Sequence, residues 1–218
     1  MTSLEEKIKQ SWKNTTIEDE YLFYNGVHEN SISHKFAEKM NIEINDICKE
    51  GKYNRNILKF HVDCEYNRNN EDVKSISIPD TTKDLPPIYK NIRPDIIIHR
   101  RGEDQSNEYC FELKRVSYYN FLNIEKITSN TMKFLENENS NNFIDGKLKS
   151  NLKQNICYVG DFRKLKFLTS QSDRPEITNF HYKIGYFVIF HVKNEKICSS
   201  FIVFKNGNFE NIISIEKF

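Results

Sequence analysis

Two acids and a lysine in the middle of the chain have the types and spacing of a metal-assisted hydrolytic site. Asp95 follows Pro94 at the start of a β-branched run, and Glu112 and Lys114 lie two residues apart in the next apolar run. Side chains two apart in a β-strand point to the same side. If the two runs pair, Asp95 and Glu112 lie side by side, and carboxylates that close repel each other unless a proton or a cation lies between them.

Oxygen ligands of this kind suit a hard divalent cation. We therefore expect Mg²⁺ or Mn²⁺ to be held by Asp95, Glu112 and the backbone carbonyl of Leu113. Lys114 would stand beside a metal-bound water, where it could orient that water or stabilise negative charge on a phosphate. Glu29, on the apolar face of an upstream helical segment, could reach the same centre directly or through a water.

Hydrophobic periodicity predicts the elements that must position these residues. Helices are expected over residues 3–13, where Ser3 and Glu6 form a capping box, and over about 27–40. Alternation of apolar and polar residues predicts strands over 58–65 and 108–114, and a β-branched run predicts another over 95–99. The last two strands are close enough in sequence to form an antiparallel hairpin, which would bring the two acids together.

The second half of the chain is predicted to complete one sheet. Residues 116–157 are less regular and are interpreted as a helical insertion, and Asp161 is a suitable N-cap for a further helix. Two or three strands are expected at the end of the chain, over 184–192, 197–204 and 209–215. The order of elements indicates a single mixed α/β (α+β) domain over residues 1–218, with a central mixed sheet flanked by helices.

Composition narrows the class of partner. The 32 Lys and Arg residues nearly balance 31 Asp and Glu residues, so the net charge is only +1. A protein that coats nucleic acid through bulk positive charge is therefore excluded, and a nucleic-acid site would have to be a local basic cluster. A hydrophobic content of 38% also excludes a wholly disordered chain.

Location is predicted from the N-terminus and the cysteines. The first residues lack the basic and apolar regions of a secretory signal, and the longest apolar run, residues 186–190, is far too short to cross a bilayer. We therefore expect no membrane partner. The five cysteines are odd in number and form no CxxC pair, so neither a zinc ribbon nor a disulfide framework is expected. A cytoplasmic protein is the simplest interpretation.

The order of an acid on a helix, an Asp at a strand start and Glu-x-Lys on the following strand resembles the PD-(D/E)XK nuclease superfamily. A closer resemblance is to a group of small bacterial members of that superfamily, most of them uncharacterised. The matching segments are Val62–Arg68, Pro94–Gly102, Phe111–Lys114, Asp161–Thr169 and Tyr182–Phe187. The resemblance implies a restriction-endonuclease-like core and hydrolysis of a phosphodiester. In that group a short linker joins Glu-x-Lys to the Asp-x-x-Lys-Leu helix, whereas here residues 116–157 intervene.

The leading hypothesis is therefore a Mg²⁺-dependent endonuclease with DNA as the favoured substrate, acting in bacterial defence or DNA processing. Arg100, Arg101, Arg115 and Lys164 are predicted to hold the nucleic-acid backbone. Two alternatives stay open: a catalytically silent binding or regulatory module, and a metal-dependent RNase. A homodimer would let two sites cut two strands, and the insertion could cap the site, bind substrate or build that dimer.

Several of these residues also have structural interpretations. The carboxylates and Lys114 could form a structural ion-pair network, and Glu29 could be an acid favoured at a helix N-terminus. Asp63 could touch the metal shell or pair with an arginine. Asp161 is expected to be a helix cap rather than a ligand, and Lys164 could be a solvated lysine.

Overall fold

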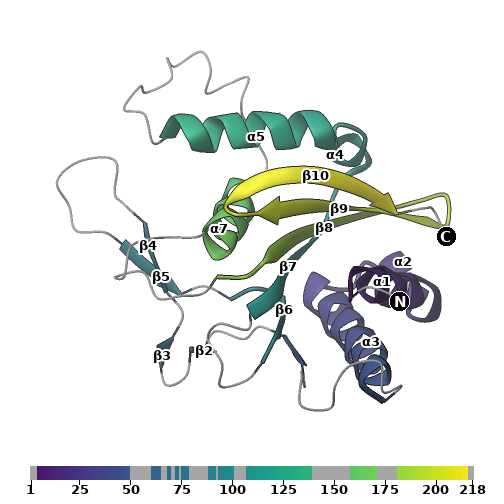
Figure 1. Ribbon diagram of the computed structural model, residues 1–218. Helices are drawn as coiled ribbons and strands as arrows, with labels where there is room; N and C mark the ends of the chain where they lie inside the picture. The colour runs from purple at the N-terminus through teal and green to yellow at the C-terminus, as the bar shows by residue number, and fades with distance from the viewer. Residues whose placement is uncertain are drawn as a thin grey trace.

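The computed structural model describes residues 4–49, 60–64, 68–69, 72–73, 75–78, 88–91, 93–100, 107–138, 158–170 and 181–215. A six-stranded mixed sheet lies at its centre (Figure 1), in the order β1-β6-β7-β8-β9-β10. The bounds of these strands are β1 His61–Cys64, β6 Ile96–His99, β7 Asn107–Arg115, β8 Ile184–Lys193, β9 Lys196–Lys205 and β10 Asn208–Ile215. Only β7 and β8 run parallel, and the other neighbours are antiparallel.

Helices cover both faces of the sheet (Figure 1). On one face lie α1 (Leu4–Glu18), α2 (Glu20–Tyr24) and α3 (Glu29–Lys49). On the other lie α4 (Tyr118–Leu122), α5 (Ile124–Glu138) and α7 (Val159–Thr169). A sheet with apolar side chains on both faces needs a helical layer on each, so the predicted mixed α/β class with one central sheet is confirmed.

The aromatic core beneath α1 fixes the first helical layer. Trp12 is fully buried, and its indole Nε1–H donates to the Ser199 hydroxyl of β9 over 2.8 Å. Its ring meets Phe23 of α2 and Phe36 of α3 edge to face, with centroids 5.8 and 5.0 Å away. One side chain therefore joins all three helices of this layer to the sheet.

The predicted hairpin is confirmed, because β6 and β7 pair antiparallel with Ile96 opposite Phe111 and Ile97 opposite Cys110. All four residues of β6 are buried, as expected for a strand that has neighbours on both edges and helices on both faces. Extending the register by one residue places Asp95 opposite Glu112. The fold thus brings the two predicted acids to the same end of adjacent strands.

Three predicted boundaries differ from the structure. α1 continues to Glu18 rather than ending near residue 13, and α3 begins at Glu29 and continues to Lys49. The prediction that Asp161 caps a helix is wrong, because α7 begins at Val159 with Tyr158 at its N-cap. Asp161 therefore lies inside the first helical turn. Ser3, the capping residue predicted for the first helix, lies outside the described residues.

Two small two-stranded sheets between β1 and β6 were not predicted. They pair β2 (Arg68–Asn69) with β3 (Asp72–Val73), and β4 (Ser75–Ile78) with β5 (Ile88–Asn91). Strands of two to four residues carry too little alternation to be recognised from sequence. Of segment 116–157, the described part contains α4 and α5. None of the described helices is both long enough and apolar enough to span a bilayer.

Candidate active site

Asp95 and Glu112 face the same side of the sheet, the side covered by α7. Their in-strand neighbours on that face, Ile97 and Cys110, belong to the core beneath α7, whereas Phe111 and Leu113 point toward α1 and α3. Because side chains alternate along a strand, the two acids share the α7 face as cross-strand neighbours. The arrangement expected from the sequence is therefore present.

The Asp95 carboxylate is held by the backbone of β7. Asp95 N–H donates to the Phe111 carbonyl over 3.0 Å, and Leu113 N–H donates to Asp95 Oδ2 over 2.7 Å. Phe111 and Leu113 thus turn their backbone polar groups toward Asp95, and the Leu113 carbonyl lies on the same edge as its N–H. Burial raises the pKa of Asp95, although the hydrogen bond from Leu113 opposes the shift.

Glu112 is a buried carboxylate with one oxygen paired and one unpaired. Its side chain is 5% exposed, and Oε2 accepts a hydrogen bond from Lys164 Nζ over 2.7 Å. Oε1 is buried and has no hydrogen-bond partner among the residues that the structure describes. Burial raises the pKa of Glu112 well above its ordinary value, the Lys164 ammonium opposes this, and Asp95 raises the pKa further. A carboxylate in this setting favours either a proton or a cation at its free oxygen.

Lys114 and Glu29 form the second ion pair of the site. Lys114 Nζ donates to Glu29 Oε2 over 2.7 Å, and Arg115 N–H donates to Glu29 Oε1 over 2.9 Å. Glu29 is the first residue of α3, so its carboxylate also lies at the positive end of the helix dipole. The hydrogen bond to Glu29 raises the pKa of Lys114, which keeps its ammonium protonated.

Asp161 is a further acid of the site, and the sequence did not identify it as one. It lies in the first turn of α7, three residues before Lys164, so both side chains lie on one face of the helix. Burial raises the pKa of Asp161, the ammonium groups of Lys164 and Lys114 lower it, and Glu29 raises it. Asp161 also raises the pKa of both Asp95 and Glu112. The Asp161 carboxyl therefore interacts electrostatically with both acids and both lysines of this site.

Four carboxylates and two ammonium groups therefore share this end of the sheet. They are Glu29, Asp95, Glu112 and Asp161, with Lys114 and Lys164. When all six are ionised, two negative charges remain uncompensated within the cluster. A bound dication, or two protons, would balance them.

The residues of this site could bind Mg²⁺ or Mn²⁺ through two carboxylates and one backbone carbonyl. No group of three or more His, Cys, Asp or Glu side chains among the described residues is placed to hold a metal ion. Asp95, Glu112 and the Leu113 carbonyl could supply three oxygen ligands, with water and substrate completing the shell, as Mg²⁺ commonly requires. The unpaired Oε1 of Glu112 is the structural feature that favours such an ion.

The residues predicted to contact nucleic acid are placed less uniformly. The Arg115 guanidinium donates to the Phe23 carbonyl over 2.5 Å and lies 5.6 Å from the centre of the Phe190 ring, so it fastens α2 to the sheet. Arg100 follows the far end of β6, about 16 Å along the strand from Asp95. Arg101 lies outside the described residues. Lys164 contacts Glu112 inside the site.

A second polar pair lies on the same face of the sheet. His99 Nε2 and Asp63 Oδ2 are 2.8 Å apart, and the His99 side chain is 6% exposed. Asp63 is opposite Ile97, which lies two residues after Asp95 on the same face, so Asp63 lies on the α7 face as well. The structure buries His99 as a partner of Asp63.

Comparison of this chain with protein-family models, with curated proteins and with solved structures finds no match.

Proposed function

We propose that the protein is a metal-dependent nuclease of the PD-(D/E)XK type that hydrolyses phosphodiester bonds, with DNA as the favoured substrate. The observation that carries this proposal is the buried Glu112, whose Oε1 is unpaired opposite Asp95. The mixed sheet flanked by helices supports it, because that is the architecture the sequence resemblance implies.

Asp95, Glu112 and the Leu113 carbonyl would hold the cation. A bound Mg²⁺ or Mn²⁺ would lower the pKa of a coordinated water and offset charge on the phosphate. Asp95 is suited to this role because its second oxygen is fixed by the Leu113 N–H, so the carboxylate cannot rotate freely. Preorganised ligands of this kind need little rearrangement when charge develops in the transition state.

Lys114 acts in this proposal as a fixed positive charge rather than as a base. Its pKa is raised by the hydrogen bond to Glu29, so it remains protonated over the neutral range. An ammonium beside the two acids would orient the attacking water and stabilise the phosphate oxygens. Glu29 is then a positioning residue, because it holds Lys114 without touching the reacting atoms.

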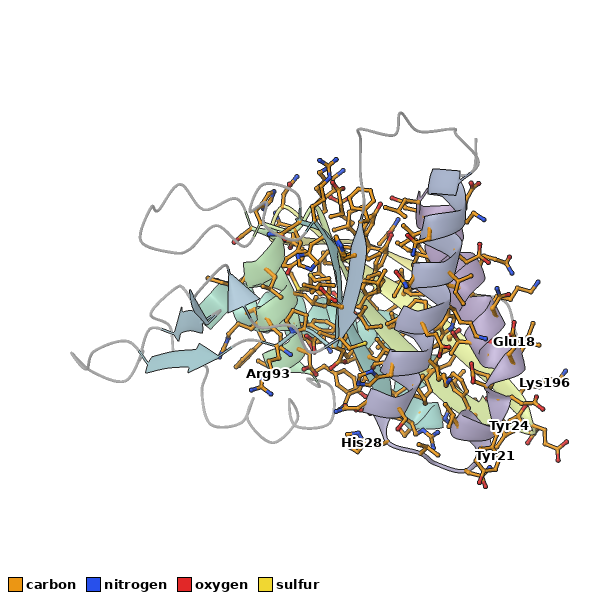
Figure 2. The ribbon with its side chains drawn as sticks, turned by 90° about the horizontal axis from the view of Figure 1, so that it is seen from below. Glu18, Tyr21, Tyr24, His28, Arg93 and Lys196 are labelled. Carbon is orange, nitrogen blue, oxygen red and sulfur yellow. The ribbon has the colours of Figure 1, made fainter. Side chains whose placement is uncertain are left out.

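His28 and Arg93 lie at the rim of the site and could guide the phosphate backbone toward it. His28 immediately precedes Glu29, and the carbonyl of Arg93 accepts a hydrogen bond from Lys164 over 3.3 Å. In Figure 2 both side chains project from the same side of the molecule. Both residues are exposed, so phosphate contacts would not require burial of either side chain.

The test is cleavage of supercoiled plasmid DNA by purified protein with Mg²⁺, Mn²⁺ or EDTA. We expect wild type to nick or cut in either metal and to be inactive in EDTA. Asp95→Ala and Lys114→Ala should each lose at least about 100-fold in rate. Lys183→Ala is the matched control, because Lys183 forms an exposed pair with Glu108 at the other end of β7.

The outcomes also separate the alternatives. Single-stranded DNA and RNA in the same assay would identify an RNase by preferential loss of the RNA substrate. Binding of nucleic acid without cleavage in either metal would favour the silent binding module. Equal cleavage by wild type, Asp95→Ala and Lys114→Ala would remove the site assignment.

A further inference from the structure

Lys164 contacts the carboxylate that the proposed metal site needs most. It reaches across from the second turn of α7 and bonds Glu112 Oε2 over 2.7 Å. The other ammonium of the cluster, Lys114, is bonded to Glu29. Lys164 is therefore the cation that compensates Glu112, and without it this buried carboxylate would have neither oxygen bonded within the described structure.

Binding of a dication to Glu112 while the Lys164 ammonium stays bonded to it is electrostatically unfavourable. Two positive charges a few ångströms apart repel strongly at a partly buried site, where screening by water is weak. The Lys164 side chain is 23% exposed, so its head can move toward solvent. The Arg93 carbonyl, 3.3 Å from Nζ, is a second acceptor that already lies within reach.

We infer that Lys164 is a displaceable counter-ion of Glu112, which competes with the divalent cation and moves off this carboxylate when the cation binds. This inference rests on the proposed metal site. Lys164 weakens the affinity for metal, and its ammonium is released at the rim of the site. A phosphate of the substrate offers that ammonium a new partner, so nucleic acid and metal bind cooperatively.

The experiment is calorimetric titration of the full chain with Mn²⁺ at pH 8, after treatment with EDTA and buffer exchange. Lys164→Gln removes the charge and keeps a hydrogen-bond donor, so we expect Mn²⁺ to bind at least about tenfold more tightly than to wild type. Lys164→Arg keeps the charge and should stay within about threefold of wild type. Lys183→Gln is the control, because it neutralises a lysine of similar pairing far from the acids.

A Lys164 that served only to hold the structure together would give the opposite result. Lys164→Gln would then bind Mn²⁺ as weakly as wild type or more weakly, and the inference would be overturned. If Lys164→Gln fails to fold, the ammonium ¹⁵N signals of the wild-type lysines provide a second measurement, with Lys164 assigned through Lys164→Arg. Adding Mg²⁺ must shift the Lys164 signal, and an unchanged signal also overturns the inference.

Failure of the inference can be told from failure of the metal site. If Glu112→Gln abolishes Mn²⁺ binding while Lys164→Gln does not strengthen it, only the counter-ion role is lost. If wild type and Lys164→Gln both fail to bind Mn²⁺, or if Glu112→Gln binds as well as wild type, the proposed metal site and the inference fall together.

Discussion

Replacing Glu112 with Gln should uncouple the stability of this protein from divalent cations. In wild type the Glu112 side chain is 5% exposed and is compensated on one oxygen only. Burying a charge costs several kcal/mol, and a good ion pair roughly offsets this. In EDTA, Glu112→Gln should therefore lie within about 1 kcal/mol of wild type, because the substitution removes the buried charge and the Lys164 ammonium left behind is 23% exposed and can turn toward solvent.

The two proteins should separate when metal is added. A ligand that binds only the folded state stabilises it by about 2.7 kcal/mol at a free concentration of 100 times its Kd. For a chain of 218 residues this corresponds to a rise in Tm of roughly 5–10 °C. Wild type should show this rise with Mn²⁺, and Glu112→Gln should show little or none.

Thermal unfolding followed by circular dichroism, over a series of Mn²⁺ concentrations, measures the difference. Glu108→Gln is the matched control, because Glu108 lies on β7 and forms an ion pair but is remote from Asp95. This control should keep the full rise in Tm. A Glu112→Gln protein that gained as much stability from Mn²⁺ as wild type would refute the metal site.

Two other predictions concern the groups around Glu112. Burial raises the pKa of Asp95 in the folded state. The Asp95 carboxyl therefore adds to the free energy of unfolding below its unfolded pKa, and this stabilisation is lost as pH rises through its folded pKa. In EDTA, Asp95→Asn should therefore gain stability relative to wild type as pH rises from the ordinary Asp pKa of 3.8 through the raised folded pKa. Urea denaturation over a pH series measures this difference, and a difference that does not change with pH would contradict the shift. Glu29→Ala should lose about 1–3 kcal/mol, because it removes the acceptor of both Lys114 and the Arg115 N–H. Glu29→Gln keeps one acceptor and should lose less in the same assay, so equal losses would argue against the hydrogen bond from Arg115.

Elements of the fold could be predicted from the sequence where the pattern that specifies them lies within a few neighbouring residues. Alternation in residues 108–114 and the β-branched run after Pro94 predicted β6, β7 and their pairing, because side-chain direction in a strand follows sequence position. Glu29 was predicted only to reach the centre formed by the two acids, directly or through a water. In the structure it bonds Lys114 Nζ and the Arg115 N–H, and neither bond was foreseen.

The contribution of α7 could not be predicted in the same way. Asp161 looked like an N-cap because acids are common there, but the helix begins two residues earlier. The spacing of Asp161 and Lys164 does place them on one face, and that was the available signal. Which part of the sheet this face meets depends on the crossover from β7 to β8, a long-range property that a single sequence does not encode locally.

The hydrogen bond from Trp12 to Ser199 has a consequence for how the chain folds during synthesis. The two residues are separated by 187 positions, so the Trp12 indole cannot bond to the sheet until β9 has left the ribosome. Contacts of this separation slow folding and leave apolar surface exposed in the meantime. Nascent or truncated chains that end before β9 should therefore depend on chaperones, since their first helical layer lacks the β9 residues on which Trp12 packs.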